Sequence, residues 1–454
     1  MSSKALESSD DADRNQLDAF MIKNEAPVQA EIEPPPDGGY GWICVAACFN
    51  INCFTWGVVS SYGVFLGYYL ENNVFPSATP TDFAFIGGLN FAVAMLASPV
   101  VTIMARQYGI HVPMSLGIVF QTTGFITASF ATQIWHLYLT QGILVGLGVG
   151  FTYIPSIAIL SQWFIRRRSL ANGISAAGSG IGGLMFSLAV RAAITNISLA
   201  WSLRIIGLIS GFMNILATIA IRSRNHIIQP RQHPFDRVLL RRYEVLLVLA
   251  WAFVSMLGYI TLLFSMSDFA RSIGLDDGQA ATVTALLNLG TALGRPFIGV
   301  ASDHFGRIQT AGVITFVCAV SVFAIWLPAT SYGVTILFVI INGAVLGVFW
   351  VTIGPVCTEV VGLEHLPSML SLSWLVIVLP VTFHLIEGYG VLERLQRNSG
   401  SRGIKKNLCG RFCHREYPLD LKMRGKCGRR LATAALKLGG LLGRKSPKFQ
   451  AVNH

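Results

Sequence analysis

The sequence predicts an all-α protein that crosses a membrane many times, and three observations support this fold class. Of its 454 residues 53% are apolar and only 13% are charged, whereas soluble domains carry about 25% charged residues. Apolar stretches follow one another along the chain, most of them near the roughly 20 residues that a helix needs to span the hydrocarbon core. The 45 glycines suit helices that pack closely against each other inside lipid.

The apolar stretches predict eleven membrane spans, of which the last is short. Loops after even-numbered spans carry most of the arginines, among them those of residues 166–168 and 222–242. Because an excess of positive charge marks cytosolic loops, the N-terminus is predicted to lie in the cytosol. The predicted spans are 41–69, 82–104, 110–131, 135–160, 169–194, 200–221, 244–267, 279–301, 309–328, 332–356 and 367–383.

A weak internal repeat divides these spans into two halves. Pro99 and Gly109 are matched at a constant offset of 197 by Pro296 and Gly306. Duplicated bundles of this kind form a binding site at the interface of the two halves. The predicted organisation is a cytosolic leader (1–36), an N-terminal bundle (37–222), a central cytosolic loop (223–243), a C-terminal bundle (244–383) and a basic tail (384–454).

The net charge of +11 belongs to the tail. Residues 384–454 contain 16 Lys and Arg against 4 Asp and Glu, while the rest of the chain contains 18 against 19. Basicity is therefore no sign of a nucleic-acid partner, and none is predicted. The apolar pattern stops at residue 383, which indicates a truncated or aberrant C-terminus. The alternative is a tail that binds anionic membrane lipid.

No metal site or cofactor is predicted. The tail has the most suggestive group of ligands, but its spacing matches known zinc modules poorly. This group is Cys409, Cys413, His414 and Cys427.

Three motifs suggest a family. Asp37-Gly38-Gly39-Tyr40-Gly41-Trp42 stands directly before the first span, and residues 163–178, which include Arg166, Arg167 and Gly173, join spans 4 and 5. Both segments closely resemble the signatures of the monocarboxylate transporter (monocarboxylate porter) family, and the first span looks more like the fungal branch. A third segment resembles the general motif of the major facilitator superfamily and reads Gly299-x-x-Ser302-Asp303-x-x-Gly306-Arg307.

The resemblance implies a major facilitator fold of two pseudo-symmetric six-helix bundles, here with the last helix or helices missing or altered. It also implies a transporter of a small monocarboxylate or related organic anion. The absence of nucleotide-binding, metal-binding and nucleophile motifs from the apolar body argues against an enzyme.

The first two motifs also have physical interpretations of their own. Asp37, Gly38 and Gly39 permit a sharp turn, and Tyr40 and Trp42 are rings typical of the membrane interface, where they would anchor the first helix. The arginines of residues 166–168 are predicted to fix the topology and to contact anionic head groups. The small residues that begin at Gly173 allow span 5 to approach a partner helix closely.

Asp303 and Arg307 lie four residues apart, a spacing that puts both on one face if the helix continues that far. In the superfamily this motif resembles a gate latch between the two halves. The alternative is a solvated ion pair worth less than about 1 kcal/mol.

Arg295 is the most informative single residue. It lies inside a predicted span, where an unpaired arginine costs about 2.5–3.5 kcal/mol, and no lysine occurs between Lys23 and Lys405. Its planar guanidinium suits a carboxylate, and the resemblance implies carboxylate binding by an arginine at this place in helix 8. The alternative is a fixed ion pair with Asp268 or Glu359.

Two positions depart from the animal proton-coupled members, which have a lysine in helix 1 and an aspartate four residues before the helix 8 arginine. Ser60 and Thr291 stand there. The familiar proton relay is therefore not expected. Either coupling uses another group, with Asp268 the nearest candidate, or transport is facilitated diffusion.

The function predicted is secondary active or facilitative transport of a small organic anion, with a proton as a candidate co-substrate. One alternative is a carrier of riboflavin or another larger organic solute. A second is a non-transporting sensor or an inactive truncated isoform, and an ancillary membrane protein is a candidate partner. The plasma membrane is the predicted location, with the vacuolar or another internal membrane as the alternative.

Overall fold

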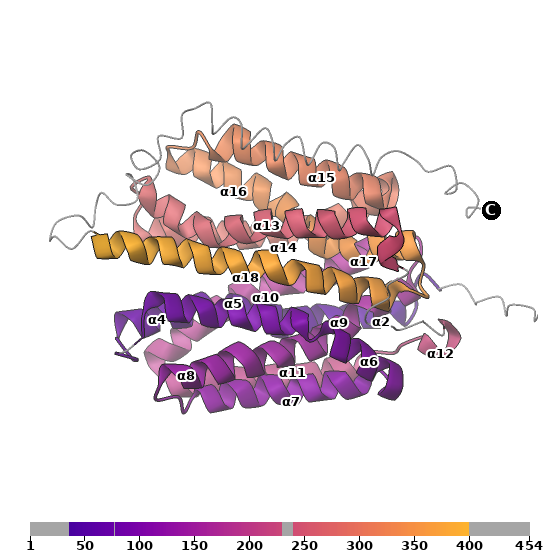
Figure 1. Cartoon of the computed structure of the whole chain (residues 1–454), viewed down its shortest axis with the longest axis horizontal. Helices are drawn as coiled ribbons and strands as arrows, with labels where there is room; N and C mark the ends of the chain where they lie inside the picture. Colours follow the sequence, from indigo (N-terminus) through magenta and orange to yellow (C-terminus); the bar gives the residue numbers. More distant parts are fainter. Residues whose placement is uncertain (1–35, 77, 229–238, 399–454) are drawn as a thin grey trace, which may run out of the picture.

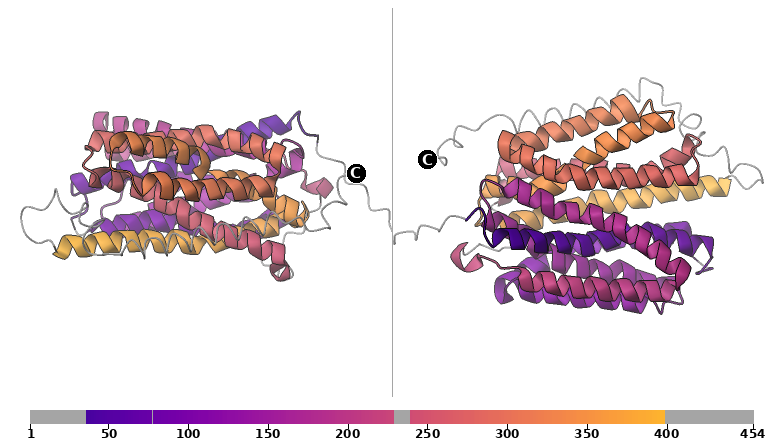
Figure 2. Two further views of the ribbon diagram at one scale, coloured as in Figure 1. Left: turned by 90° about the horizontal axis from the view of Figure 1, so that it is seen from above. Right: turned by 180° about the vertical axis from the view of Figure 1, so that it is seen from behind.

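The computed structural model describes residues 36–76, 78–228 and 239–398. Every regular element within these residues is a helix, and nine helices are long and apolar enough to cross a membrane. Figure 1 shows that the helices form two bundles side by side, the first drawn from indigo to magenta and the second from red to yellow. The views of Figure 2 show the same division. The predicted all-α membrane fold is confirmed.

The N-terminal half contains six successive helical segments at the six predicted places. Spans 1, 2 and 4 are interrupted, and spans 3, 5 and 6 are single helices. In chain order the elements are α2 (Gly41–Phe54), α3 (Trp56–Ser60), α4 (Tyr62–Glu71), α5 (Pro80–Leu96), α6 (Ser98–Tyr108), α7 (His111–Ala128), α8 (Ile134–Leu137), the π-helical segment Tyr138–Leu144, α9 (Val145–Trp163), α10 (Arg168–Asn196) and α11 (Leu199–Ala220).

The C-terminal half supplies five further segments. The elements are the short α12 (Asn225–Ile228) and a 3₁₀ turn (Leu239–Arg241), then α13 (Tyr243–Ser272), α14 (Asp277–Phe305), α15 (Arg307–Ser321), the π-helical segment Val322–Trp326, α16 (Tyr332–Leu346), α17 (Val348–Val361) and α18 (Leu366–Asn398).

Span 1 is broken into three pieces, which its apolar pattern does not predict. The backbone leaves the helical region at Thr55, whose hydroxyl donates to the carbonyl of Ile51 at 2.6 Å. The Ser61 hydroxyl likewise donates to Val58 at 2.7 Å. Because such side-chain bonds compete with the backbone ladder, they bend a helix. The bends place Trp56 within the core.

The last helix continues beyond the predicted end of span 11. The apolar part of α18 is Leu366–Thr382, but the helix itself runs to Asn398. The predicted tail therefore begins within a helix rather than after one. Residues 399–454, with the four candidate zinc ligands, lie outside the described residues. Residues 229–238 of the predicted central loop also lie outside them.

Two pairs of helices make the most extensive contacts between the two halves. Helix α10 packs against α14, and α5 packs against α18. The predicted close approach of span 5 to a partner is confirmed, because a Cβ atom added to Gly173 would lie 2.5 Å from the carbonyl oxygen of Arg295, and one added to Gly180 would lie 2.8 Å from the Ala292 side chain. Glycines thus allow α10 to contact the backbone of α14.

Replacing Gly173 with alanine tests this contact. Alanine favours a helix over glycine by about 1 kcal/mol, but at this position its methyl group meets backbone atoms that cannot turn away. We expect Gly173→Ala to lower the melting temperature of the purified protein, because overpacking costs about 1–3 kcal/mol. The matched control is Gly258→Ala in α13, an exposed site with no atom within 4 Å. A melting temperature for Gly173→Ala equal to or above that of Gly258→Ala would contradict the assignment.

Candidate functional site

The first signature binds the second. The Asp37 carboxylate accepts hydrogen bonds from the backbone N–H groups of Ile165 and Arg166, at 2.6 and 2.9 Å, and the Asp37 N–H donates to the Trp163 carbonyl at 3.1 Å. The predicted sharp turn is present, since Asp37 and Gly39 have φ values of 51° and 58°. The turn presents the carboxylate to the loop between α9 and α10.

The rings of the first signature contact the same loop. Tyr40 lies 5.8 Å from Trp163, and Trp42 lies 5.1 Å from Phe164 in an edge-to-face arrangement. The Tyr40 hydroxyl donates to the carbonyl of Ala220 at 2.9 Å. Both rings are half-buried. The interpretation as rings of the membrane interface is therefore incomplete, because their contacts join α2 to the second signature.

Asp303 of the third motif binds the start of α10 from the other half. Its two carboxylate oxygens accept from the backbone N–H groups of Ser169 and Leu170, at 2.9 and 2.8 Å. These N–H groups belong to the first turn of a helix, where they have no partner within the helix and carry partial positive charge. The Ser302 hydroxyl adds a 3.0 Å bond to the Ser169 hydroxyl. The carboxylate thus caps a helix across the interface of the halves.

Arg307 extends this contact. Its guanidinium donates to the carbonyl of Ile165, and its Nε lies 3.9 Å from the Asp303 carboxylate. The condition that one helix continues through both residues is not met, because α14 ends at Phe305 and the chain turns at Gly306, which has a φ of 97°. The ion pair forms across that turn.

The three arginines of the second signature differ in their surroundings. Arg166 and Arg167 are exposed, as expected of residues that face head groups, whereas Arg168 is 6% exposed. Its Nε donates to the carbonyl of Phe164 at 2.8 Å. The prediction of a shared lipid-facing role is therefore wrong for Arg168, which ties together the end of α9 and the start of α10.

These contacts form one unit, which we call the cytosolic latch: Asp37, residues 163–170, Asp303 and Arg307. Residues 163–170 are bound by one carboxylate from their own half and one from the other half. Sequence reasoning did not assign Glu359 of α17 to this region. It interacts electrostatically with Arg168 and Arg307, and its Oε2 has no hydrogen-bond partner among the described residues. An acidic residue inside an apolar span was the available signal.

Arg295 lies deeper, where α14 crosses α10. Its side chain is 4% exposed, and it donates to the carbonyl of Ala176 and the hydroxyl of Ser179. Tyr153 and Tyr259 interact with the guanidinium. Its Nε has no partner among the described residues.

The sequence offered two acidic partners for an ion pair with Arg295, and the structure describes the side chain of one of them, Glu359. Within the described part of the chain, the ion pair in this region joins Arg307 to Asp303, and Glu359 interacts with Arg168 and Arg307 rather than with Arg295. Asp268 belongs to α13, but its side chain lies outside the described residues.

The two departing positions carry no charge. The Ser60 hydroxyl donates to the Trp56 carbonyl at 2.8 Å, and the Thr291 hydroxyl donates to the Leu287 carbonyl at 2.9 Å. Both bonds lie within the residue's own helical segment. Neither hydroxyl replaces the charged residue of the animal members.

A central group of aromatic side chains was not predicted. It includes Trp56 and Tyr153 from the first half and Trp350 and Trp374 from the second. Each ring stands in a separate apolar stretch, where nothing in the local pattern distinguishes it from lipid-facing residues. Among the described residues no three His, Cys, Asp or Glu side chains group as a metal site.

The comparison with known families decides the assignment. Residues 45–380 match the sequence profile of the Major Facilitator Superfamily. The chain belongs to this superfamily. Its fold resembles that of the superfamily's proton:xylose symporter XylE, with a TM-score of 0.67 at 11% identity over 90% of this chain and 96% of that one.

Relatives within the superfamily support the monocarboxylate transporter resemblance. The probable transporter MCH2 of Saccharomyces cerevisiae is 34% identical over 345 residues, which cover 75% of this chain and 73% of that protein. Human monocarboxylate transporter 12 is 28% identical over 423 residues, which cover 84% and 80%. The predicted family is confirmed, and the chain is a multi-pass membrane transporter of the superfamily, whose members are transporters rather than enzymes.

The latch can be tested through the two backbone N–H groups that donate hydrogen bonds to Asp303. Removing a helix cap costs about 0.5–2 kcal/mol, so we expect Asp303→Ala to accelerate hydrogen exchange at Ser169 and Leu170 roughly two- to thirty-fold. Exchange is measured by mass spectrometry on a peptide that contains these residues. The control is Asp276→Ala, which removes a 2.6 Å cap bond to the Gln279 N–H at the other end of α14. Unchanged exchange in Asp303→Ala, or equal acceleration in the control, would contradict the latch.

Proposed function

We propose that the chain transports a small organic anion with a carboxylate group by alternating access, and that Arg295 binds the carboxylate. The observation that supports this proposal is a buried guanidinium whose hydrogen bonds go to a neutral carbonyl and a neutral hydroxyl. Carbonyl dipoles stabilise the cation only in part. An incoming carboxylate would supply the missing negative charge and accept from the unpartnered Nε.

Several features make an anion the best-supported substrate. Arg295 lies at the crossing of α10 and α14, which belong to different halves, as expected of a transporter binding site. The chain has no lysine between Lys23 and Lys405, so no lysine of the apolar body could bind the anion instead. The name of human monocarboxylate transporter 12 points to the same class of solute.

The cytosolic latch supplies the gate of this proposal. With Asp303 bound to the start of α10, the two halves are held together at the end that the arginine distribution assigns to the cytosol. Passage of a solute to that side requires these bonds to break as the halves separate. Arg307 binds the same loop and would be released in the same movement.

Coupling to protons would use a group other than the usual relay. Ser60 and Thr291 are uncharged and bond to their own helices. Asp268 is the candidate that we retain, since it belongs to α13 and directly follows the apolar stretch 244–267. Without such a group transport is facilitative.

Substitution of Arg295 tests the proposal. We expect Arg295→Ala to reduce uptake of radiolabelled pyruvate, lactate or acetate by proteoliposomes at least ten-fold, because a hydrogen bond to a charged group contributes about 1.5–3 kcal/mol. Arg295→Lys keeps the charge but loses the planar fork, so its uptake should fall less than that of alanine.

The control for this experiment is Arg204→Ala. This arginine donates to Ser129 at 2.8 Å and stacks on Phe130, away from α14. Its replacement removes the same charge and should leave uptake within two-fold of the original. All variants are compared at an equal amount of protein, and each must have the melting temperature of the original protein. Original-rate uptake by Arg295→Ala would refute the assignment.

A further inference from the structure

Six aromatic rings from six helices gather between the two halves, and we call them the central aromatic cluster. Three come from the first half and three from the second. Ring centroids across the interface lie 6.0 Å apart for Trp56 and Trp350, 6.2 Å for Phe91 and Trp350, and 6.1 Å for Tyr153 and Trp374. The members are Trp56 of α3, Phe91 of α5, Tyr153 of α9, Tyr259 of α13, Trp350 of α17 and Trp374 of α18.

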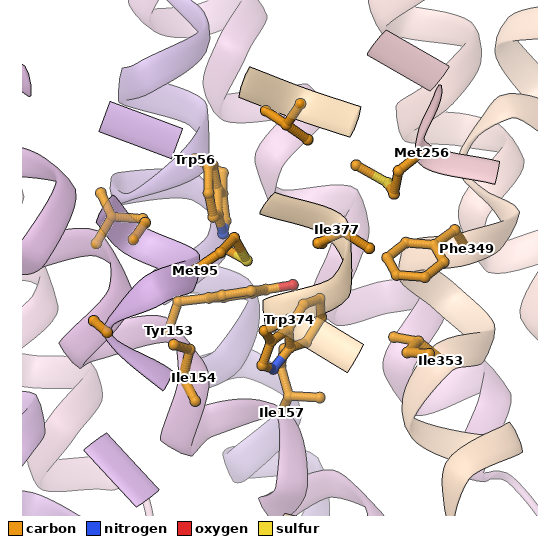
Figure 3. Close-up of a cluster of buried hydrophobic side chains, with 14 of the residues drawn as sticks. Trp56, Met95, Tyr153, Ile154, Ile157, Met256, Phe349, Ile353, Trp374 and Ile377 are labelled. Carbon is orange, nitrogen blue, oxygen red and sulfur yellow. The ribbon is translucent and has the colours of Figure 1, made fainter. Parts of the chain in front are cut away.

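The cluster fills the centre of the molecule. Figure 3 shows the Tyr153 ring between Trp56 and Trp374, with Ile377 and Phe349 beyond. Trp350 and Trp374 stack at 5.9 Å with an interplanar angle of 17°. Trp374 has no exposed surface. Rings from the two halves therefore close on each other in this structure.

The cluster holds hydrogen-bond donors that no described residue satisfies. The indole Nε1 atoms of Trp56, Trp350 and Trp374 are buried and have no partner among the described residues. Each unsatisfied buried donor costs about 1–3 kcal/mol, and a buried tryptophan usually finds a partner for its N–H. Phenylalanine would supply an aromatic ring without that cost, though a smaller one. Three such donors in one cluster indicate a ligand that accepts hydrogen bonds.

The cluster is continuous with the proposed carboxylate site. Tyr153 and Tyr259 both lie close enough to the Arg295 guanidinium for an electrostatic interaction, and their ring centroids lie 6.5 and 6.0 Å from that of Trp350. One solute can therefore reach both features, with its carboxylate on Arg295 and the rest of its body among the rings. Such a solute is polar at one end and flat and apolar at the other.

From these contacts we propose that the transported anion carries an aromatic or heteroaromatic ring. The inference rests on the proposed function and names its substrate class. Opening the halves breaks ring pairs worth about 0.5–1.5 kcal/mol each beyond their buried area. A substrate ring replaces those contacts and presents acceptors to the indole N–H groups. A short aliphatic acid such as acetate replaces neither.

Competition by two acids of nearly equal size tests the substrate class. Benzoate and cyclohexanecarboxylate share the carboxylate and differ in the π-face. The measurement is the concentration of unlabelled acid that halves the uptake of labelled benzoate by proteoliposomes. We expect this concentration to be at least ten-fold lower for benzoate than for cyclohexanecarboxylate. Acetate and lactate should compete more weakly than either. Nicotinate, which has a ring acceptor, should compete at least as well as benzoate.

Variants of the cluster locate the preference. Trp350→Leu removes the ring that faces both tyrosines, and we expect the concentration ratio between the two acids to fall toward one. Trp350→Phe keeps a ring but loses the donor, so the benzoate preference persists while nicotinate loses any advantage. The control is Trp135→Phe in α8, whose ring is 52% exposed and lies outside the cluster. Because the readout is a ratio, a lower amount of folded protein does not alter it.

The outcomes separate this inference from the proposed function. Equal competition by benzoate and cyclohexanecarboxylate, with uptake that still requires Arg295, refutes the aromatic substrate and leaves the anion transporter intact. Competition by benzyl alcohol that equals benzoate, with no effect of Arg295→Ala, refutes the anion proposal itself. An aromatic preference that Trp350→Leu does not change refutes the assignment to the cluster.

Discussion

The structure depends on one loop that two carboxylates bind from opposite sides. Residues 163–170 turn from α9 into α10 and expose backbone N–H groups that no helix satisfies. Asp37 accepts two of them from within the N-terminal half, and Asp303 accepts two more from the C-terminal half. Because Asp37 fixes the loop within its own half, Asp303 meets a preformed receptor. The first contact lies within one half, and the second joins the two halves.

Helix α10 carries the consequences of this arrangement into the core. Its glycines allow close contact on two sides, since Gly178 lies against the carbonyl of Phe49 in α2 and Gly173 lies against the carbonyl of Arg295 in α14. Contacts of this kind are specific to backbone positions and tolerate little added volume. In the alternating access proposed above, α10 would stay with α2 while α14 moves past it, once the Arg295 bonds to α10 have broken.

The sequence predicted the positions of the helices well, but it predicted poorly which side chains contact each other. The eleven helical places follow from apolar length, and the inward position of Arg295 follows from the cost of an arginine in lipid. The Asp37 contact could not be predicted, because the donors to its carboxylate are backbone N–H groups, which every residue type except proline offers. The burial of Arg168 beside exposed Arg166 depends on the direction in which the loop turns. The central aromatic cluster joins rings up to about 300 residues apart, and no local pattern records that proximity.

Two attachments between α10 and α14 connect the gate with the proposed binding site. Asp303 binds at Ser169 and Leu170, and Arg295 binds at Ala176 and Ser179, six to ten residues further along the same helix. At 1.5 Å per residue these points are about 10 to 15 Å apart. A movement that separates the helices must break both. A carboxylate that binds the guanidinium competes for its donors and weakens the inner attachment, so the free energy of ligand binding is available to favour separation of the halves. In the proposed cycle the latch would then be the remaining bond between the two helices, and its strength would set how often the halves separate at that end.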